Sequence, residues 1–282
     1  MNSLKSYVHS VSAIAPNSKF RFVLDLARYI LEKPHRSGVL LRNLGEHVRA
    51  MKFANSWRDA TAGQPLVPVI RANPLREYFE AHETGRGIWK WLHYFDAYHR
   101  HFAKFVNREV HILEIGVFGG GSLEMWRNYF GPDCRVYGVD IEPVCGTYEQ
   151  ERTKIFIGDQ ADPSFWKSFR AQVPTLDIVL DDGGHEAEQQ IVTLEALLPH
   201  LRPGGVYLCE DITGVRNPFS SYLNGLVSSL NITRQKEGYK TTAFQQAVGS
   251  VHFYPLVAVI ERLDAVRESL DSVRRGSEWA LD

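Results

Sequence analysis

The chain has little of several features that mark whole classes of protein. Its 282 residues include three cysteines, none of them in a C-x-x-C pair, so neither a disulfide framework nor a structural zinc site is expected. No apolar run approaches the roughly 18–20 residues that a membrane span needs. The N-terminus lacks the long apolar stretch of a secretory signal. These absences predict a cytoplasmic protein with reduced thiols.

The chain also has no strong excess of charge. Lys and Arg number 32 against 33 Asp and Glu, which gives a formal net charge of -1. A protein that lives on phosphate contacts is usually basic, so a dedicated nucleic-acid binder is not expected. The 44% hydrophobic content excludes wholesale disorder. We expect a small-molecule substrate, no nucleic-acid or membrane partner, and association into a homo-oligomer.

The texture of the sequence predicts two parts. Residues 1–83 read as a mainly helical region with a linker, and residues 84–282 as the main domain. Within and just after the first part, the apolar spacing and the Pro and Gly content predict helices over Phe20–Leu31 and Val39–Ala50, a loop over Thr61–Pro74, and an aromatic helix covered on both sides over Ile88–Phe105.

From Glu109 onward, short apolar runs alternate with helical stretches, which is typical of βαβ units. Two further runs almost touch around Pro255, and so short a return requires antiparallel pairing. The sequence predicts an α/β fold: a Rossmann-like doubly wound sheet of five parallel strands closed by an antiparallel hairpin. The expected strands are Val110–Ile115, Arg135–Val139, Lys154–Ile157, Asp177–Leu180, Val206–Cys209, Ser250–Tyr254 and Leu256–Glu261, and the expected helices are Ser122–Phe130, Pro163–Ala171 and Glu186–His200.

A glycine-rich turn follows the first strand, in the run LEIGVFGGGS. Its glycines allow a sharp turn and a close backbone approach to a ligand. A dinucleotide fold would show G-x-G-x-x-G, but Glu114 occupies the first position of that pattern and would repel a pyrophosphate. A cationic ligand such as S-adenosylmethionine is favoured instead, with a purely structural turn as the alternative. The candidate cofactor residues here are Glu114, Gly116, Gly119, Gly120 and Ser122.

The next two strands also end in polar residues. Asp140 and Glu142 are placed to hold ribose hydroxyls, and Asp159 and Gln160 to reach an adenine amino group. Each acid alone is more often a turn or N-cap residue. Their meeting at the carboxyl edge of one sheet is what indicates a ligand site.

The run D-D-G-G-H at 181–185 and the acids at 210–211 follow strands four and five. Neighbouring strands lie about 4.8 Å apart, so Asp182, Glu210 and Asp211 are expected to meet. Converging carboxylates need a compensating charge, and oxygen ligands favour Mg²⁺ or Ca²⁺. The alternative is that one acid caps a helix while another points to solvent.

Histidine titrates near neutral pH, so His185 is the candidate general base, beside Asp182 as a catalytic residue. The alternative is a helix-start histidine that donates to a carboxylate. Asp181 is expected on the cofactor side. Most of the aromatic segment reads as core packing, with His93 and Tyr94 as the expected substrate contacts.

Together these motifs resemble class I S-adenosylmethionine-dependent methyltransferases. The resemblance rests on E-x-G-x-x-G-G at 114–120, Asp140, Asp159 and the terminal hairpin. D-D-G-G-H and E-D more narrowly resemble the metal-dependent O-methyltransferases of macrolide sugars (mycinamicin type), with the cephalosporin-hydroxylase and rhamnosyl O-methyltransferase group as a close relative. The similarity covers roughly residues 84–262. It implies Mg²⁺ at Asp182, Glu210 and Asp211, and His185 as the base.

The expected function is S-adenosylmethionine- and Mg²⁺-dependent O-methylation of a hydroxyl on a small natural product, with a sugar hydroxyl as the expected acceptor. Two alternatives stay open: a catechol or phenol O-methyltransferase, and a non-catalytic S-adenosylmethionine-binding protein. The intact acid and histidine set argues against the second, because a binder has no need of a metal cluster. A dehydrogenase is opposed by Glu114.

Overall fold

The computed structural model describes residues 37–58, 72–213, 217–232 and 240–277. The chain divides into two compact units, residues 1–70 and 71–282. In the first unit the described helix is α3 (Ser37–Asn55), which is longer than the predicted one. The predicted helix Phe20–Leu31 and most of the predicted loop lie outside the described residues. No described helix is long and apolar enough to cross a membrane. The predicted boundary after residue 83 stays a prediction.

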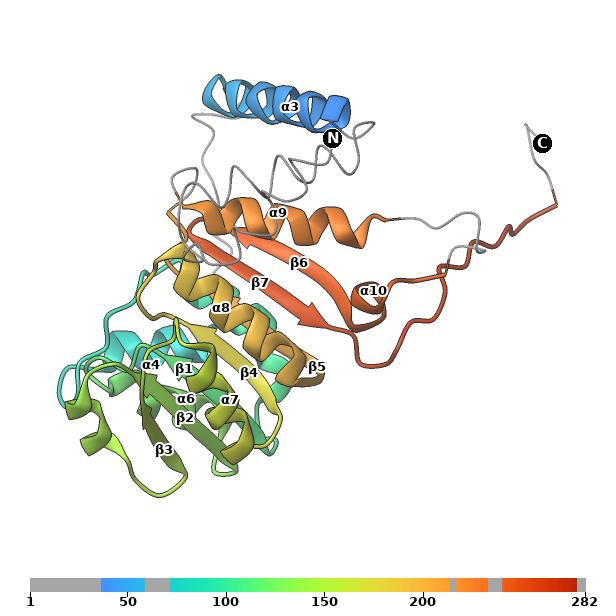
Figure 1. Ribbon diagram of the computed structural model, residues 1–282. Coiled ribbons are helices and arrows are strands. Elements are labelled where there is room, and N and C mark those ends of the chain that lie inside the picture. Colours follow the sequence, from blue (N-terminus) through green and yellow to red (C-terminus); the bar gives the residue numbers. More distant parts are fainter. Residues whose placement is uncertain (1–36, 59–71, 214–216, 233–239, 278–282) are drawn as a thin grey trace, which may run out of the picture. The chain divides into compact units, whose positions relative to one another are not determined.

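The second unit is built on a seven-stranded sheet in the order β3-β2-β1-β4-β5-β7-β6 (Figure 1). Five strands pair in parallel, and β7 lies antiparallel between β5 and β6. The predicted fold class is thereby confirmed. The strands are β1 (Val110–Ile115), β2 (Cys134–Asp140), β3 (Thr153–Ile157), β4 (Leu176–Asp181), β5 (Leu201–Cys209), β6 (Val248–Tyr254) and β7 (Val257–Arg262).

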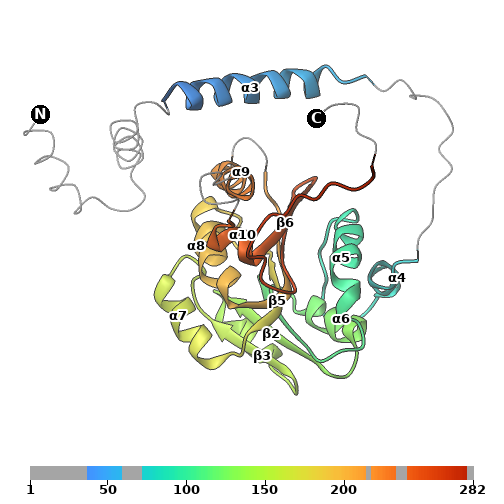
Figure 2. The ribbon, with the colours of Figure 1, turned by 90° about the vertical axis from the view of Figure 1, so that its right-hand side faces the viewer.

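Helices cover both faces of this sheet (Figure 2). One apolar core forms between the sheet and α4, α5 and α6, and a second forms against α7, α8 and α9. β1 is buried along its whole length, as a central parallel strand should be. The helices are α4 (Pro74–Ala81), α5 (Tyr94–Phe102), α6 (Gly121–Phe130), α7 (Pro163–Gln172), α8 (Ala187–Leu197), α9 (Pro218–Leu230) and α10 (Ala243–Ala247), with 3-10 turns η3 (Ala103–Phe105), η4 (Pro143–Tyr148) and η5 (Leu198–His200).

Two local predictions for the segment before the sheet were wrong. The helix expected over Ile88–Phe105 begins only at Tyr94, because the residues before it run to the sheet edge and contribute side chains there. Pro74, expected in a loop, opens α4 instead. Proline is well suited to the first helical turn, and the Asn73 side chain caps that helix by accepting from the Arg76 amide.

Candidate active site

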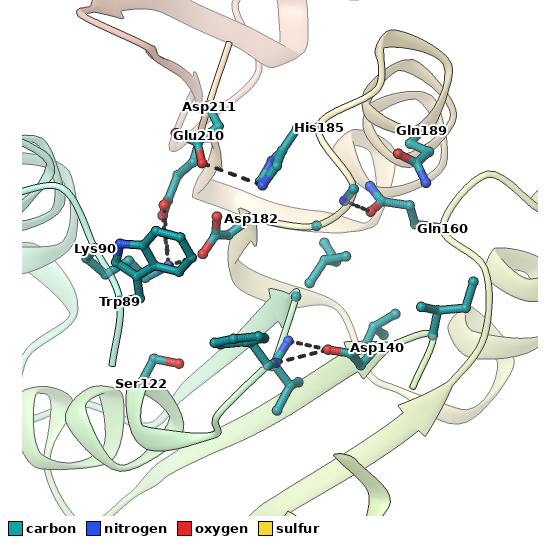
Figure 3. A pocket seen from close by; sticks show the side chains of 18 of the residues that line it. Trp89, Lys90, Ser122, Asp140, Gln160, Asp182, His185, Gln189, Glu210 and Asp211 are labelled. Atoms are coloured by element: carbon teal, nitrogen blue, oxygen red, sulfur yellow. Dashed lines mark hydrogen bonds and ion pairs between the residues drawn. The ribbon is translucent and has the colours of Figure 1, made fainter. Parts of the chain in front are cut away.

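One cavity of about 740 Å³ lies at the carboxyl edge of the parallel strands (Figure 3). Its lining comes from the glycine turn after β1, the ends of β2 and β3, the loops after β4 and β5, and residues 87–91 before α5. Open α/β sheets bind ligands at this edge. The fold therefore brings the predicted motifs to one place.

The glycine turn is held by both backbone and side-chain contacts. Gly116 has a φ of +88°, and a Cβ there would lie 1.9 Å from the Asp182 carbonyl oxygen, so only glycine fits. Asp140 Oδ2 accepts from the amides of Val117 and Phe118 at 2.9 and 3.0 Å. The acid at the end of β2 thus fixes the shape of the turn after β1, and it also lines the cavity.

Several predicted cofactor residues line the cavity: Gly116, Gly119, Ser122, Asp140, Asp159 and Gln160. Glu114 is placed differently from the prediction. It is fully buried, accepts a 2.8 Å hydrogen bond from Ser122 Oγ, and lies 3.5 Å from Lys90 Nζ. Its carboxylate therefore lies behind the cavity lining, next to Ser122 and Lys90. Gly120, Glu142 and Asp181 also lie outside the described cavity lining.

Asp181 and Gln160 act together on the loop after β4. Gln160 Oε1 accepts from the Gly184 amide at 2.8 Å, and its Nε2 donates to Asp181 Oδ1 at 3.1 Å. Tyr207 donates to the other oxygen of Asp181 at 2.9 Å. Burial raises the pKa of Asp181 to about 6. Asp181 therefore braces the loop that presents Asp182 and His185.

The carboxylates after β4 and β5 meet around a lysine that the sequence analysis did not single out. Lys90 Nζ lies 2.5 Å from Asp182 Oδ2 and 3.3 Å from both oxygens of Glu210. Its side chain is 3% exposed. Burial lowers the pKa of Lys90, but the surrounding carboxylates outweigh burial and raise it above the ordinary value. Lys90 therefore supplies the positive charge that converging carboxylates require.

Glu210 is turned inward from the cavity edge. It is almost fully buried, and Tyr98 donates to its Oε1 at 2.6 Å. Burial raises the pKa of Glu210, and the charge of Lys90 opposes that rise. Both Glu210 oxygens are therefore engaged, Oε1 by Tyr98 and Lys90 and Oε2 by Lys90.

Asp211 faces His185. Its Oδ1 accepts from the Tyr94 hydroxyl at 2.6 Å and from Trp91 Nε1 at 3.1 Å, and its Oδ2 lies 3.5 Å from His185 Nε2. One ligand atom from each of Asp182, His185 and Asp211 lies within 4.8 Å of the others. The structure thus brings together two of the three predicted metal ligands, Asp182 and Asp211, and the predicted base His185. The third predicted ligand, Glu210, is buried beside this group and contacts Lys90.

Several residues that line the cavity have strained backbone conformations. Six described residues other than glycine have a positive φ, and Phe118, His185, Asp211 and Leu256 among them line this cavity. Such conformations cost about 1–3 kcal/mol each and cluster at functional sites. Their location supports a ligand-binding role for this edge rather than a purely structural one.

The two predicted substrate contacts do not line the cavity. His93 Nε2 lies 3.0 Å from the Pro255 carbonyl oxygen in the β6–β7 turn, and Tyr94 is buried with its hydroxyl on Asp211. Because α5 starts only at Tyr94, the preceding residues Trp89, Lys90 and Trp91 take the places at the cavity. The sequence feature that could have indicated these cavity residues is the single lysine, Lys90, between two tryptophans.

The sequence and structure of the chain are similar to those of known methyltransferases. Residues 113–212 match the family model described as a methyltransferase domain. The chain is 37% identical to demethylmacrocin O-methyltransferase of Streptomyces fradiae over 198 residues, which is 62% of this chain and 50% of that protein. It is 34% identical over 199 residues to 8-demethyl-8-alpha-L-rhamnosyl tetracenomycin-C 2'-O-methyltransferase of Streptomyces olivaceus, covering 62% and 52%.

Among solved structures, MycE methyltransferase from the mycinamycin pathway, in complex with Mg, SAH and mycinamycin VI, is similar with a TM-score of 0.55 and 28% identity. The match covers 68% of this chain and 53% of MycE. The predicted resemblance to class I methyltransferases, and to those acting on macrolide sugars, is confirmed. The chain spans about half the length of these relatives.

Proposed function

We propose that the chain is an S-adenosylmethionine- and divalent-metal-dependent O-methyltransferase that acts on a hydroxyl of a small natural product, with a sugar hydroxyl as the acceptor. The observation that carries the proposal is the joining, in one cavity, of a glycine turn shaped by Asp140 and an acid–histidine edge made of Asp182, His185 and Asp211.

The chemistry of the lining fits the proposed cofactor. Asp140 and Asp159 bring carboxylates to the same cavity as the glycine turn. A sulfonium cofactor is cationic and carries no phosphate, so it is favoured by this negative lining where a dinucleotide is not. Asp140 Oδ2 accepts from the two turn amides and Oδ1 accepts from the Glu142 amide at 2.9 Å, which leaves Oδ1 one lone pair for a ribose hydroxyl.

The donor set also fits a divalent metal ion. Asp182, Asp211 and Glu210 would hold it, with Glu210 contributing least because Lys90 and Tyr98 already contact both of its oxygens, whereas Lys90 contacts Asp182 only through Oδ2. Carboxylate oxygens are ligands that Mg²⁺ accepts. When bound, such an ion lowers the pKa of a coordinated hydroxyl and fixes its aim.

His185 is the proposed general base. Its side chain is 40% exposed, so an acceptor can reach it, and Asp211 Oδ2 lies 3.5 Å from its Nε2. Asp211 is itself fixed through its other oxygen by Tyr94 and Trp91. The carboxylate would therefore orient the imidazole and stabilise the imidazolium that forms when His185 takes the acceptor proton.

The cavity mouth suits an acceptor with an apolar body. Trp89 is 84% exposed and Phe118 is 74% exposed, and their ring centroids lie 6.4 Å apart. Of the related proteins named above, one is the O-methyltransferase of a rhamnosyl tetracenomycin, in which a sugar is joined to a larger molecule. Both observations support a glycosylated apolar molecule over a free sugar.

The test is methyl transfer from labelled S-adenosylmethionine to a panel of glycosylated macrolides and aromatic polyketides, beside catechol and simple phenols. The proposal expects transfer to a sugar hydroxyl that chelation abolishes and added Mg²⁺ restores. Transfer to catechol alone would favour the phenol alternative. Tight S-adenosylhomocysteine binding with no transfer to any acceptor would favour a non-catalytic binder. The predicted homo-oligomer and cytoplasmic location stay predictions.

A further inference from the structure

A second cluster of metal-ligating side chains lies away from the cavity, between α5 and the β6–β7 hairpin. His101 comes from α5, His252 from β6 and Glu261 from β7. One ligand atom of each lies within 4.8 Å of the other two. None of the three lines the candidate active site, so this cluster has no part in the proposed methyl transfer.

The hairpin register explains why the cluster forms. Ser250 pairs with Glu261, and His252 with Val259, so alternate residues of β6 share a face with Glu261. His101 reaches that face from α5 and lies beside His252, with 4.7 Å between the ring centroids and the rings tilted at 58°. The α5 helix and the β6–β7 hairpin, which lie far apart in sequence, thus bring two histidines to one carboxylate.

We propose that His101, His252 and Glu261 form a second metal site, for a zinc-class divalent ion bound by two imidazoles and one carboxylate with a fourth position open to solvent. His101 Nδ1 lies 3.1 Å from Glu261 Oε1, and His252 Nε2 lies 3.4 Å from Glu261 Oε2. Ligands about 2.0–2.1 Å from a tetrahedral zinc lie about 3.4 Å from one another. The two observed separations, one to each oxygen of Glu261, are close to this value, and Ser250 Oγ, 2.9 Å from His252 Nε2, is the contact that an ion would displace.

The surroundings are those of a prepared site. Tyr254 hydroxyl lies 2.9 Å from His101 Nε2, the ring nitrogen opposite the proposed ligand atom. A metal-bound histidine almost always has its other nitrogen on such a partner, which fixes the ring. The contacts with His101 lower the pKa of Glu261 to about 2, so its carboxylate is ionised at neutral pH, as a metal ligand must be.

Access and charge are the remaining requirements. The side chains of His252 and Glu261 are 38% and 27% exposed, while that of His101 is 4% exposed, so an ion can enter from solvent onto a buried ligand. Lys104 Nζ lies 3.6 Å from Glu261 Oε1 and opposes a cation there. Its side chain is 42% exposed, so it can turn into solvent when an ion binds.

The test uses Co²⁺ as a visible probe for zinc, on chelator-treated protein kept in excess Mg²⁺ to occupy the oxygen-rich site. We expect one equivalent of Co²⁺ to give the intense absorption of a low-coordinate nitrogen-ligated ion, and Zn²⁺ to displace it. Zn²⁺ should also raise the melting temperature, because it binds only the folded chain. Absence of both the absorption and the shift in the wild type would overturn the proposal.

Variants distinguish a metal site from the alternative, a purely structural cluster in which hydrogen bonds among the same side chains hold α5 against the hairpin (a brace). His252→Ala and Glu261→Gln should each weaken Co²⁺ binding by more than about 100-fold, and Tyr254→Phe by about 10-fold. Lys104→Gln should tighten binding, which a brace does not predict. His99→Ala, on the same helix but outside the cluster, and Asp211→Asn, in the other site, should bind Co²⁺ as the wild type does. If Asp211→Asn abolished the signal while His252→Ala kept it, the ion would belong to the candidate active site and the proposal would fail.

Discussion

The two sides of the cavity are built by different means. The glycine side, made of the Gly116–Gly119 turn with Asp140, is shaped by backbone amides that donate to one carboxylate at the end of the neighbouring strand β2. The carboxylate side is made of Asp182, His185, Glu210 and Asp211. Its shape depends on contacts with side chains from distant segments, chiefly the ion pairs of Lys90 with Asp182 and Glu210. The first side depends on local geometry, and the second on the balance of buried charge.

The difference explains what the sequence could predict. The strands of the parallel sheet, the glycine turn and the acids at the strand ends follow from local patterns, and the structure places most of these acids at the predicted cavity, with Glu114, Glu142 and Asp181 outside its lining. Lys90 could not be placed that way, because its partners Asp182 and Glu210 lie 92 and 120 residues further along the chain. Aromatic periodicity instead predicted a helix through Lys90, and the tertiary ion pairs override it.

The largest effect is expected on the glycine side, from Gly116→Ala. Its Cβ would collide with the Asp182 backbone, and the residue would be held at a φ of +88°. We expect at least about 4 kcal/mol less free energy of unfolding and no measurable S-adenosylhomocysteine binding. Chemical denaturation and calorimetry measure both. Gly146→Ala is the matched control, because its Cβ meets nothing within 4 Å; equal losses in the two variants would contradict the account.

On the carboxylate side, Lys90→Met should remove the charge that balances Glu114 and Glu210. Breaking a buried ion pair in this way costs about 3–5 kcal/mol. Adding Glu210→Gln to the Lys90→Met variant should restore part of the loss, because one uncompensated carboxylate disappears. Lys167→Met, at an exposed position on α7, is the control. A double variant no more stable than Lys90→Met alone would show that Lys90 acts by packing rather than by charge.

Substitution of the three acids of the carboxylate side should lower metal affinity by different amounts. Asp182→Asn and Asp211→Asn are each expected to weaken Mg²⁺ or Mn²⁺ binding by about 100-fold or more. Glu210→Gln should weaken it less, since Lys90 and Tyr98 contact both oxygens of Glu210, whereas Lys90 contacts Asp182 only through Oδ2. Titration of Mn²⁺ followed by its paramagnetic signal gives all three values. An equal loss in Glu210→Gln would make it a full ligand.

The smallest expected effect is on the pH dependence of stability and comes from His111, which belongs to neither side of the cavity. His111 is buried at the start of β1 and lies 3.0 Å from the Tyr137 hydroxyl; burial, aided by Arg202, lowers its pKa below the ordinary value of 6.5. The folded state therefore binds the proton less well than the unfolded state. Stability should be full above about pH 6.5 and fall as pH drops through the lowered pKa. Melting curves should show a shallower acid slope for His111→Gln; an unchanged slope would refute this assignment.

The division of labour between the two sides is tested most directly by S-adenosylhomocysteine binding and methyl transfer measured together on His185→Ala. His185 is partly exposed, so the variant should fold. Cofactor affinity should stay within a few-fold of wild type, kcat should fall by about 10²–10⁴, and the acidic limb of the pH–rate profile should be lost. A folded variant that binds metal and turns over within a few-fold of wild type, with the limb retained, would contradict this expectation.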